Sequence, residues 1–298
     1  MSTNSNIEWT TNTWNPIWGC TKISPGCKHC YAETLAERFR GKSFKNGKPN
    51  PFVTGFDLRL VPHKLAEPLH LRTPGFIFVN SMSDLFQERV PSEFIEAVCE
   101  VMMLADWHTF QVLTKRSERM LELLNGPLKR FAMAPHIWWG VSVEDKEYGL
   151  SRIEHLRAAS VAVRFLSVEP LLEDIGEVNL SGIHWVIVGG ESGRGARPMS
   201  PEWATALRDQ CVRESVPYFF KQWGGANKKK AGRLLDGKKW EQMPTVVRAS
   251  VPDRDALKRR QKLGKAIAES ASKLKLVELK VPADHEQIAS DHPFGGQS

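Results

Sequence analysis

The sequence lacks any apolar run long enough to cross a membrane, and it has few cysteines. A membrane span needs about 20 consecutive apolar residues, and no segment of the 298 residues approaches that length. The first residues, Met1–Trp9, lack the basic and apolar regions of a signal peptide. We therefore expect a soluble, cytoplasmic protein without membrane contacts. In that compartment the five cysteines indicate metal binding or catalysis rather than disulfide bonds.

Most of the chain has no net charge. Residues 226–298 contain 16 Lys and Arg against 9 Asp and Glu, which accounts for the whole net charge of +7. Residues 1–225 carry equal numbers of basic and acidic side chains. We expect 226–298 to be a basic, partly helical or disordered extension that binds a polyanion such as nucleic acid. The alternative is a solvated end without a partner.

Short apolar runs alternate with amphipathic segments from residue 76 onward. The apolar runs predict buried strands at 76–79, 110–113, 137–141, 163–166, 185–188 and 218–220. The segments between them predict helices at 92–105, 116–125, 146–158 and 201–215. Strands that alternate with helices form parallel sheets. We expect an α/β domain over residues 1–225, a partial (β/α) barrel of about six or seven parallel strands with a first strand near 13–18. A doubly wound sheet is the alternative.

Three of the five cysteines fall within eleven residues, in the spacing C-x6-C-x2-C. They are Cys20, Cys27 and Cys30, and Pro25-Gly26 predicts a turn that brings the first two together. Thiolates at this spacing bind soft metals. An iron–sulfur cluster with three protein thiolates keeps one iron open for another ligand. The pattern therefore favours a cluster site that precedes the sheet.

Zinc is the alternative for the same cysteines. A structural zinc site has four protein ligands, and His29 would have to be the fourth. His29 lies inside the tight C-x2-C turn, where it is poorly placed for that role. The other two cysteines, Cys99 and Cys211, lie in apolar helical patterns and are expected to be buried core thiols.

Polar or charged side chains follow each predicted strand. Functional groups of a (β/α) barrel lie at the C-terminal ends of its strands and in the loops that follow, so these residues form one candidate site. A simpler reason for their polarity is that strand ends meet solvent. The candidates are Asn80, Ser81, Ser142, Glu144, Glu169, Gly189, Gly190, Glu191 and Lys221. The two glycines lack a Cβ and would let a ligand approach the backbone closely.

A cysteine loop before a (β/α) domain resembles the radical S-adenosylmethionine (SAM) superfamily, whose common spacing is C-x3-C-x2-C. Five further motifs over residues 7–225 are similar to phage and bacterial radical-SAM-like proteins of unassigned function. They are Trp9–Pro16, Val79–Phe86, Leu166–Pro170, Val188–Gly193 and Lys221–Gly224. The resemblance implies a [4Fe-4S] cluster on the three cysteines, bound SAM and an external electron donor. It also implies a radical enzyme that modifies a substrate, with nucleic acid favoured by the basic extension.

The resemblance also suggests roles for the strand-end residues. Asn80 and Ser81 would contact the amino and carboxylate groups of SAM, and Ser142 and Glu144 its ribose hydroxyls. Gly189 and Gly190 would admit the cofactor, and the substrate would face Glu169, Glu191 and Lys221. Two alternatives remain open. One is a zinc-stabilised nucleic-acid-binding module without catalysis, and the other is a radical SAM enzyme that acts on a peptide or small molecule.

Overall fold

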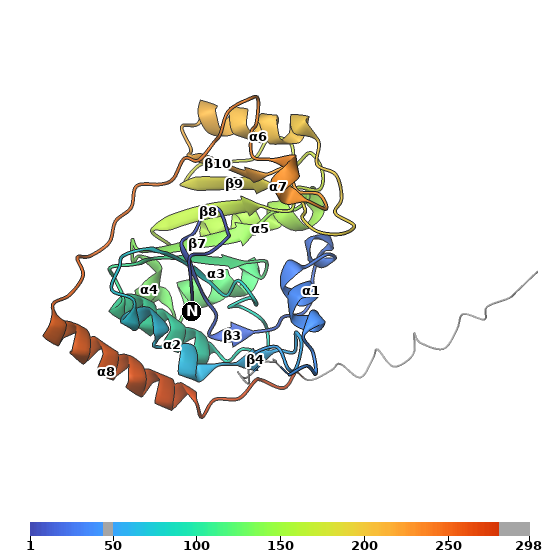
Figure 1. The fold of residues 1–298 in the computed structure, drawn as a ribbon. Helices are drawn as coiled ribbons and strands as arrows, with labels where there is room; N and C mark the ends of the chain where they lie inside the picture. The colour runs from blue at the N-terminus through green and yellow to red at the C-terminus, as the bar shows by residue number, and fades with distance from the viewer. Residues whose placement is uncertain (44–49, 280–298) are drawn as a thin grey trace, which may run out of the picture.

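A computed structural model describes residues 1–43 and 50–279 and shows one eight-stranded sheet at the centre of the molecule (Figure 1). The strand order is β1-β2-β5-β6-β7-β8-β9-β10. All neighbours from β2 to β10 pair in parallel, and β1 pairs with β2 in antiparallel fashion. Because β1 and β10 form the two edges, the sheet is not closed into a barrel. The strands are β1 (Ser2–Thr3), β2 (Asn12–Trp14), β5 (Phe76–Val79), β6 (Thr109–Thr114), β7 (Ile137–Ser142), β8 (Val163–Val168), β9 (Trp185–Gly189) and β10 (Tyr218–Gln222).

The first predicted strand divides into two. β2 joins the main sheet beside β5, whereas β3 (Ile17–Trp18) pairs with β4 (Arg59–Leu60) in a separate two-stranded sheet. The first strand expected near 13–18 is therefore present as β2, but it ends at Trp14 and the rest of that range does not belong to the main sheet. Pro16 lies between the two strands, and a proline has no N–H with which to continue a ladder.

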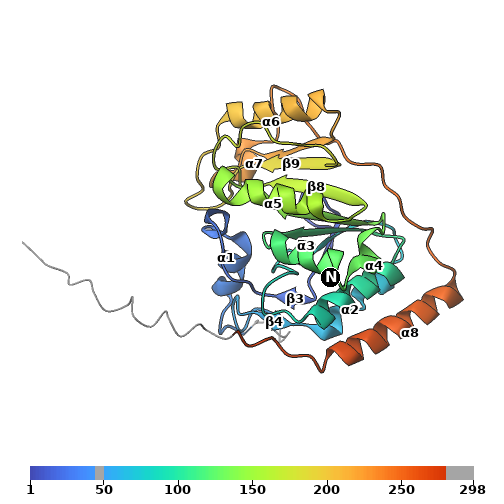
Figure 2. The same ribbon diagram turned by 180° about the vertical axis from the view of Figure 1, so that it is seen from behind.

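Helices α2 to α6 cover one face of the sheet (Figure 2). Their apolar side chains share a core with every second residue of the strands, which are the residues that point to that face. A doubly wound sheet would need helices on both faces, so that alternative was wrong. The helices are α1 (Tyr31–Arg38), α2 (Ser92–Leu104), α3 (Ser117–Asn125), α4 (Lys129–Ala132), α5 (Lys146–Ala158), α6 (Pro201–Arg213), α7 (Lys228–Ala231) and α8 (Arg254–Ala271).

The opposite face of the sheet is aromatic. Its buried side chains form a second cluster, consisting of Trp9, Phe78, Trp138, Phe165, Trp185, Ile187 and Phe219. No helix contributes to this cluster in the described residues. Ile7 from the N-terminal segment and Met243 and Val246 from the C-terminal segment pack against it. The two ends of the folded region therefore cover the face that the helices leave open.

The chain beyond residue 225 returns to the sheet. Residues 240–242 pair with the free edge of β10, where Phe220 donates its N–H to the carbonyl of Trp240 at 2.9 Å. α8 then packs against α2 and the 3-10 turns η2 (Pro62–Lys64) and η3 (Glu67–His70). The predicted boundary after residue 225 thus has extensive contacts across it. The last part of the predicted extension, 280–298, lies outside the described residues.

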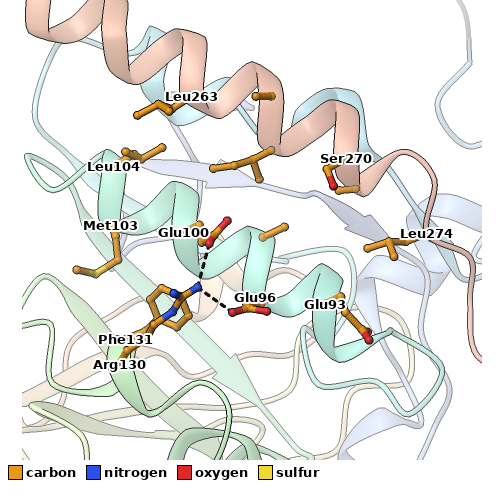
Figure 3. A pocket seen from close by; sticks show the side chains of 14 residues that line it. Glu93, Glu96, Glu100, Met103, Leu104, Arg130, Phe131, Leu263, Ser270 and Leu274 are labelled. Carbon is orange, nitrogen blue, oxygen red and sulfur yellow. Dashed lines mark hydrogen bonds and ion pairs between the residues drawn. The ribbon is translucent and has the colours of Figure 1, made fainter.

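A cavity of about 930 Å³ lies between α2 and α8. Its α2 wall is acidic, and Arg130 reaches from α4 to Glu96 at 2.8 Å and to Glu100 at 2.9 Å (Figure 3). The opposite wall is mostly apolar and includes Leu263 of α8 and Leu274, which lies just after that helix. This cavity contains none of the predicted site residues.

Candidate functional site

A second cavity, of about 450 Å³, lies where the parallel strands end. Residues at or just after the ends of β6, β7, β8, β9 and β10 meet there with the start of α1 and with the aromatic face. Ligand cavities of parallel sheets form at the carboxyl ends of the strands. The lining residues are Ile7, Trp9, Gly26, His29, Cys30, Tyr31, Phe78, Leu113, Lys115, Ser142, Ser167, Glu169, Pro170, Gly190, Glu191, Ser192, Lys221 and Gln222.

The structure brings half of the predicted site residues to this cavity. The residues that line it are Cys30, Ser142, Glu169, Gly190, Glu191 and Lys221. The other predicted residues do not line it: Cys20 and Cys27 lie elsewhere in the cysteine loop, residues 19–30, and the rest are Asn80, Ser81, Glu144 and Gly189. The cysteine loop and the strand ends therefore belong to one region of the molecule.

The Glu169 carboxylate and the Lys221 ammonium form an ion pair in the cavity, with Oε1 and Nζ 3.0 Å apart. Ser167 donates its hydroxyl to the other carboxylate oxygen at 3.2 Å. Gly189 makes room for this arrangement, since a Cβ at that position would lie 2.5 Å from Glu169 Oε1. Gly190 is similarly required by the backbone of Trp223, which a Cβ at position 190 would overlap. Protein atoms thus fill the space that these two glycines leave.

Arg116 anchors the first part of the cysteine loop. It lies just after β6, is almost fully buried, and pairs with Asp84 at 3.2 Å and Glu88 at 2.7 Å. Its Nη2 donates to the Thr21 hydroxyl at 2.8 Å, and its Nη1 lies 3.4 Å from the Cys20 sulfur, to which it donates. Burial raises the pKa of Cys20 to about 12, and the Asp84 charge adds to this, while Arg116 opposes it.

The middle of the loop rests on a buried ion pair. Glu144 is fully buried and accepts from Arg152 of α5 at 2.6 Å. A Cβ at Gly26 would lie 3.0 Å from the Glu144 carboxyl carbon, so the loop packs tightly over this side chain, which would have to shift slightly for a larger residue. Burial raises the pKa of Glu144, but the charges of Lys115 and Arg152 outweigh that effect and the net shift is downward.

A third arginine joins the loop to the segment after β9. Arg197 donates from Nε to Glu191 Oε2 at 2.9 Å and from Nη2 to the Pro25 carbonyl at 2.9 Å. Burial raises the pKa of Glu191, and hydrogen bonds from Arg197 and the charge of His29 lower it further than burial raises it. Three arginine–carboxylate pairs from different strand ends therefore position the cysteine loop.

The other two loop cysteines also have donors beside them. Cys27 ends the 3-10 turn η1 (Pro25–Cys27), and its sulfur lies 3.7 Å from the Ser24 hydroxyl. Cys30 immediately precedes α1. Burial raises the pKa of Cys30, while the N–H groups of Ala32 and Glu33 in the first turn of that helix act to lower it. Donors of this kind stabilise sulfur that carries negative charge, as iron-bound thiolates do.

Residues 1–43 and 50–279 contain no group of three or more His, Cys, Asp or Glu side chains that could hold a metal ion as they are placed in this structure. Binding of an iron–sulfur cluster by Cys20, Cys27 and Cys30 stays a prediction. Cys99 and Cys211 are both fully buried, as expected, and lie on α2 and α6 away from the loop.

Asn80 and Ser81 support the loop from behind. Asn80 has a positive φ of 62°, is buried, and its Oδ1 accepts from the N–H of Ile17 at 3.4 Å. The Ser81 hydroxyl donates to Asn15 Oδ1 at 3.3 Å, and its carbonyl accepts from the Tyr31 hydroxyl at 2.5 Å. Their predicted contact with SAM remains a prediction, and neither residue lines the cavity.

Several polar lining residues were not among the predicted candidates, and three of them have a signal in the sequence. Lys115 directly follows β6, Gln222 ends β10, and Tyr31 follows Cys30. Their positions carried the same signal as the chosen residues, since each lies next to a strand end or a loop cysteine. His29, considered above only as a zinc ligand, also lines the cavity.

The described residues contain no helix that is both long and apolar enough to span a bilayer. Neither a curated protein nor a solved structure matches the chain. A family model with the description "Protein of unknown function (DUF5131)" matches residues 4–244. The matched region includes the cysteine loop, the strands from β2 to β10 and the whole lining of the cavity. The chain therefore belongs to this family of proteins of unknown function.

Proposed function

We propose that the chain is an iron–sulfur enzyme of the radical SAM type. Cys20, Cys27 and Cys30 would hold a [4Fe-4S] cluster, and the open sheet would serve as a partial (β/α) barrel. The observation that carries the proposal is that Cys30 lines the same cavity as the ends of β7, β8, β9 and β10. When bound, the cluster would offer an open iron to SAM and supply the electron, drawn from an external donor, that cleaves its carbon–sulfur bond.

The cavity's own residues would bind and orient the ligands. Trp9 and Phe78 form an apolar wall that excludes water from one side. Glu169 and Lys221 neutralise one another at 3.0 Å, so this pair presents hydrogen-bonding groups without net charge. Glu191 is held by Arg197 on the other side. We propose that these three polar residues face the substrate, and that Ser142 contacts the cofactor.

We further propose nucleic acid as the partner of the basic C-terminal region. α8 places Lys258, Lys262 and Lys265 at exposed positions spaced by four and three residues, on one side of the helix. Its other side is seated on the protein through Leu257, with Gly264 next to Leu69. A basic stripe on a fixed helix suits the contacts to phosphate that dominate nucleic-acid affinity.

Anaerobic purification and reconstitution with iron and sulfide test the central proposal. The protein should be brown and contain about four iron and four sulfide per chain. After reduction in the presence of SAM it should release 5′-deoxyadenosine. Single changes of Cys20, Cys27 or Cys30 to Ala should abolish both results. Cys99→Ala and Cys211→Ala are matched controls that should retain them.

Two results would contradict the proposal. Colourless protein with one zinc per chain would favour the zinc-stabilised binding module. A protein that holds the cluster but releases no 5′-deoxyadenosine would retain the iron–sulfur site and lose the radical SAM assignment.

A further inference from the structure

Lys115 brings to the cavity a positive charge that has no close ion pair in the described residues. It is half-buried and lines the cavity beside Ser142. The described residues contain no ion pair of its ammonium group, and the one hydrogen bond they give it is from its backbone N–H to Asp84, at 3.1 Å. The other charged groups of the lining differ in this respect, because Lys221 is paired with Glu169 and Glu191 with Arg197.

The carboxylates near Lys115 have closer partners of their own. Glu144 is paired with Arg152 at 2.6 Å, and Asp84 with Arg116 at 3.2 Å. The Lys115 charge lowers the pKa of Glu144 without forming a close ion pair with it. A cation that lacks a close counter-ion in a partly enclosed space loses hydration, and an anionic group of a ligand can supply the direct contact. The charge pattern of the cavity therefore leaves one place for a ligand anion.

The backbone around Lys115 is fixed in place. Asp84 accepts from the Thr114 hydroxyl at 2.7 Å, from the Lys115 N–H at 3.1 Å and from the Phe86 N–H at 3.0 Å. The end of β6 is thus held by one buried carboxylate. Only the flexible side chain of Lys115 remains free to adjust, which suits a group that closes on a ligand.

We propose that Lys115 is the anion-binding residue of this cavity, and that it receives a carboxylate or phosphate group of a small ligand. If the anion is the carboxylate of SAM, the proposal rests on the function proposed above. Lys115 would then make the contact with the SAM carboxylate that the sequence suggested for Asn80 and Ser81. The phosphate form places a nucleotide substrate at the same position.

Binding measurements on the full chain distinguish the two sources. S-adenosylhomocysteine carries the carboxylate, and 5′-methylthioadenosine lacks it. Adenosine 5′-monophosphate carries a phosphate, and adenosine lacks it. Each probe is titrated calorimetrically into the wild type, Lys115→Met and Lys115→Arg. Lys129→Met removes the same charge from an exposed position on α4, outside the lining and outside the cysteine loop, and is the control.

We expect Lys115→Met to lower the affinity for one anionic probe about tenfold or more, as the loss of a charge-assisted hydrogen bond does. The affinity for the neutral counterpart of that probe should stay within about twofold of the wild-type value. Lys115→Arg should restore much of the affinity, and Lys129→Met should behave as wild type. A loss confined to S-adenosylhomocysteine assigns the anion to the cofactor, and one confined to the nucleotide assigns it to the substrate. Equal affinities in wild type and Lys115→Met, or no binding of either anionic probe to the wild type, overturn the proposal. Failure of the proposed function appears separately, as absence of iron and sulfide.

Discussion

Glu169 reaches across the end of β9 to Lys221, so that residues from two strands that are not neighbours in the sheet form one ion pair. The contact passes over Gly189. A Cβ at position 189 would lie only 2.5 Å from Glu169 Oε1, so a side chain there would collide with the carboxylate. The ion pair and the glycine are therefore one structural unit.

Gly189→Ala should displace the Glu169 carboxylate and destabilise the protein by about 1–3 kcal/mol, the usual cost of an extra methyl group in a packed site. Denaturant unfolding measures this change. In Glu169→Ala/Gly189→Ala the obstacle is gone, so the double variant should lose less stability than the sum of the single variants. Strict additivity would show that the two positions do not interact.

Arg152→Met should be strongly destabilising. It leaves Glu144 buried without its 2.6 Å partner, and an unpaired buried charge costs about 3–5 kcal/mol. Replacing both residues, as in Glu144→Gln/Arg152→Met, should recover much of the loss in the same unfolding measurement. An Arg152→Met protein with wild-type stability would remove this ion pair from the supports of the cysteine loop.

Arg116→Met should change the reduction potential of the cluster in the proposed enzyme, while the protein still binds the cluster. The guanidinium donates to the Cys20 sulfur, and hydrogen bonds to cluster sulfurs raise the reduction potential. We expect a more negative midpoint potential, measured by redox titration with electron paramagnetic resonance, at unchanged iron content. Arg119→Met is the control, because Arg119 donates to the Val90 carbonyl and not to a cysteine. Identical potentials in the Arg116→Met and wild-type proteins would restrict Arg116 to a structural role.

His108 should make the protein less stable in mild acid. Its Nε2 lies 3.0 Å from the Leu71 carbonyl, and burial lowers its pKa from 6.5 to about 4. Between these values the unfolded chain binds a proton that the folded chain does not, so stability falls as pH falls from 6.5 to 4. From pH 7 to pH 5 the loss should be about 2 kcal/mol.

The variant His108→Gln should reduce that dependence on pH, because glutamine does not titrate. His70→Gln serves as a control, since His70 is exposed. Unfolding curves at several pH values provide the comparison. If His108→Gln and the wild type keep the same slope between pH 5 and pH 7, His108 is not responsible for it.

The basic stripe of α8 should contribute to nucleic-acid affinity through salt-dependent contacts. In the triple variant Lys258→Gln, Lys262→Gln, Lys265→Gln, binding to DNA or RNA should weaken. The slope of log affinity against log salt should decrease by about 0.7–0.9 for each phosphate that the variant no longer neutralises. Fluorescence anisotropy over a range of salt concentrations measures both changes.

A triple variant elsewhere controls for net charge. Lys42, Lys129 and Lys146 are also exposed, and their replacement by Gln removes the same charge without touching α8. Superimposable salt curves for the wild type and the α8 variant, or an equal loss in both triple variants, would contradict a specific role for this helix.

The strands and helices were largely predictable because their patterns are local. The run predicted as a strand at 163–166 became β8 at 163–168, and the helix expected at 146–158 is α5 over the same residues. Closure of the sheet was not predictable, because it depends on which segments occupy the edges. The pairing of residues 240–242 with β10 involves no apolar run that marks a strand.

The candidate site was predictable only in its outline. Chain order and strand ends indicated which loops would meet, and residues such as Cys30 and Glu169 do line one cavity. Hydrogen bonds between distant segments leave no such pattern, since Arg197 and the Pro25 carbonyl to which it donates are 172 residues apart. The paired glycines illustrate the limit: their sequence suggested room for a ligand, and Gly189 instead accommodates Glu169.

The aromatic face of the sheet has a consequence for how the protein is made. Its cover includes Met243 and Val246, which leave the ribosome only after the strands up to β10 have been synthesised. Until then a growing chain displays Trp138, Trp185 and their neighbours on a surface that no helix protects. Such surfaces bind chaperones and associate with one another. A chain that ends before residue 243 should therefore accumulate as aggregates in the cell, even though every strand of the main sheet is present.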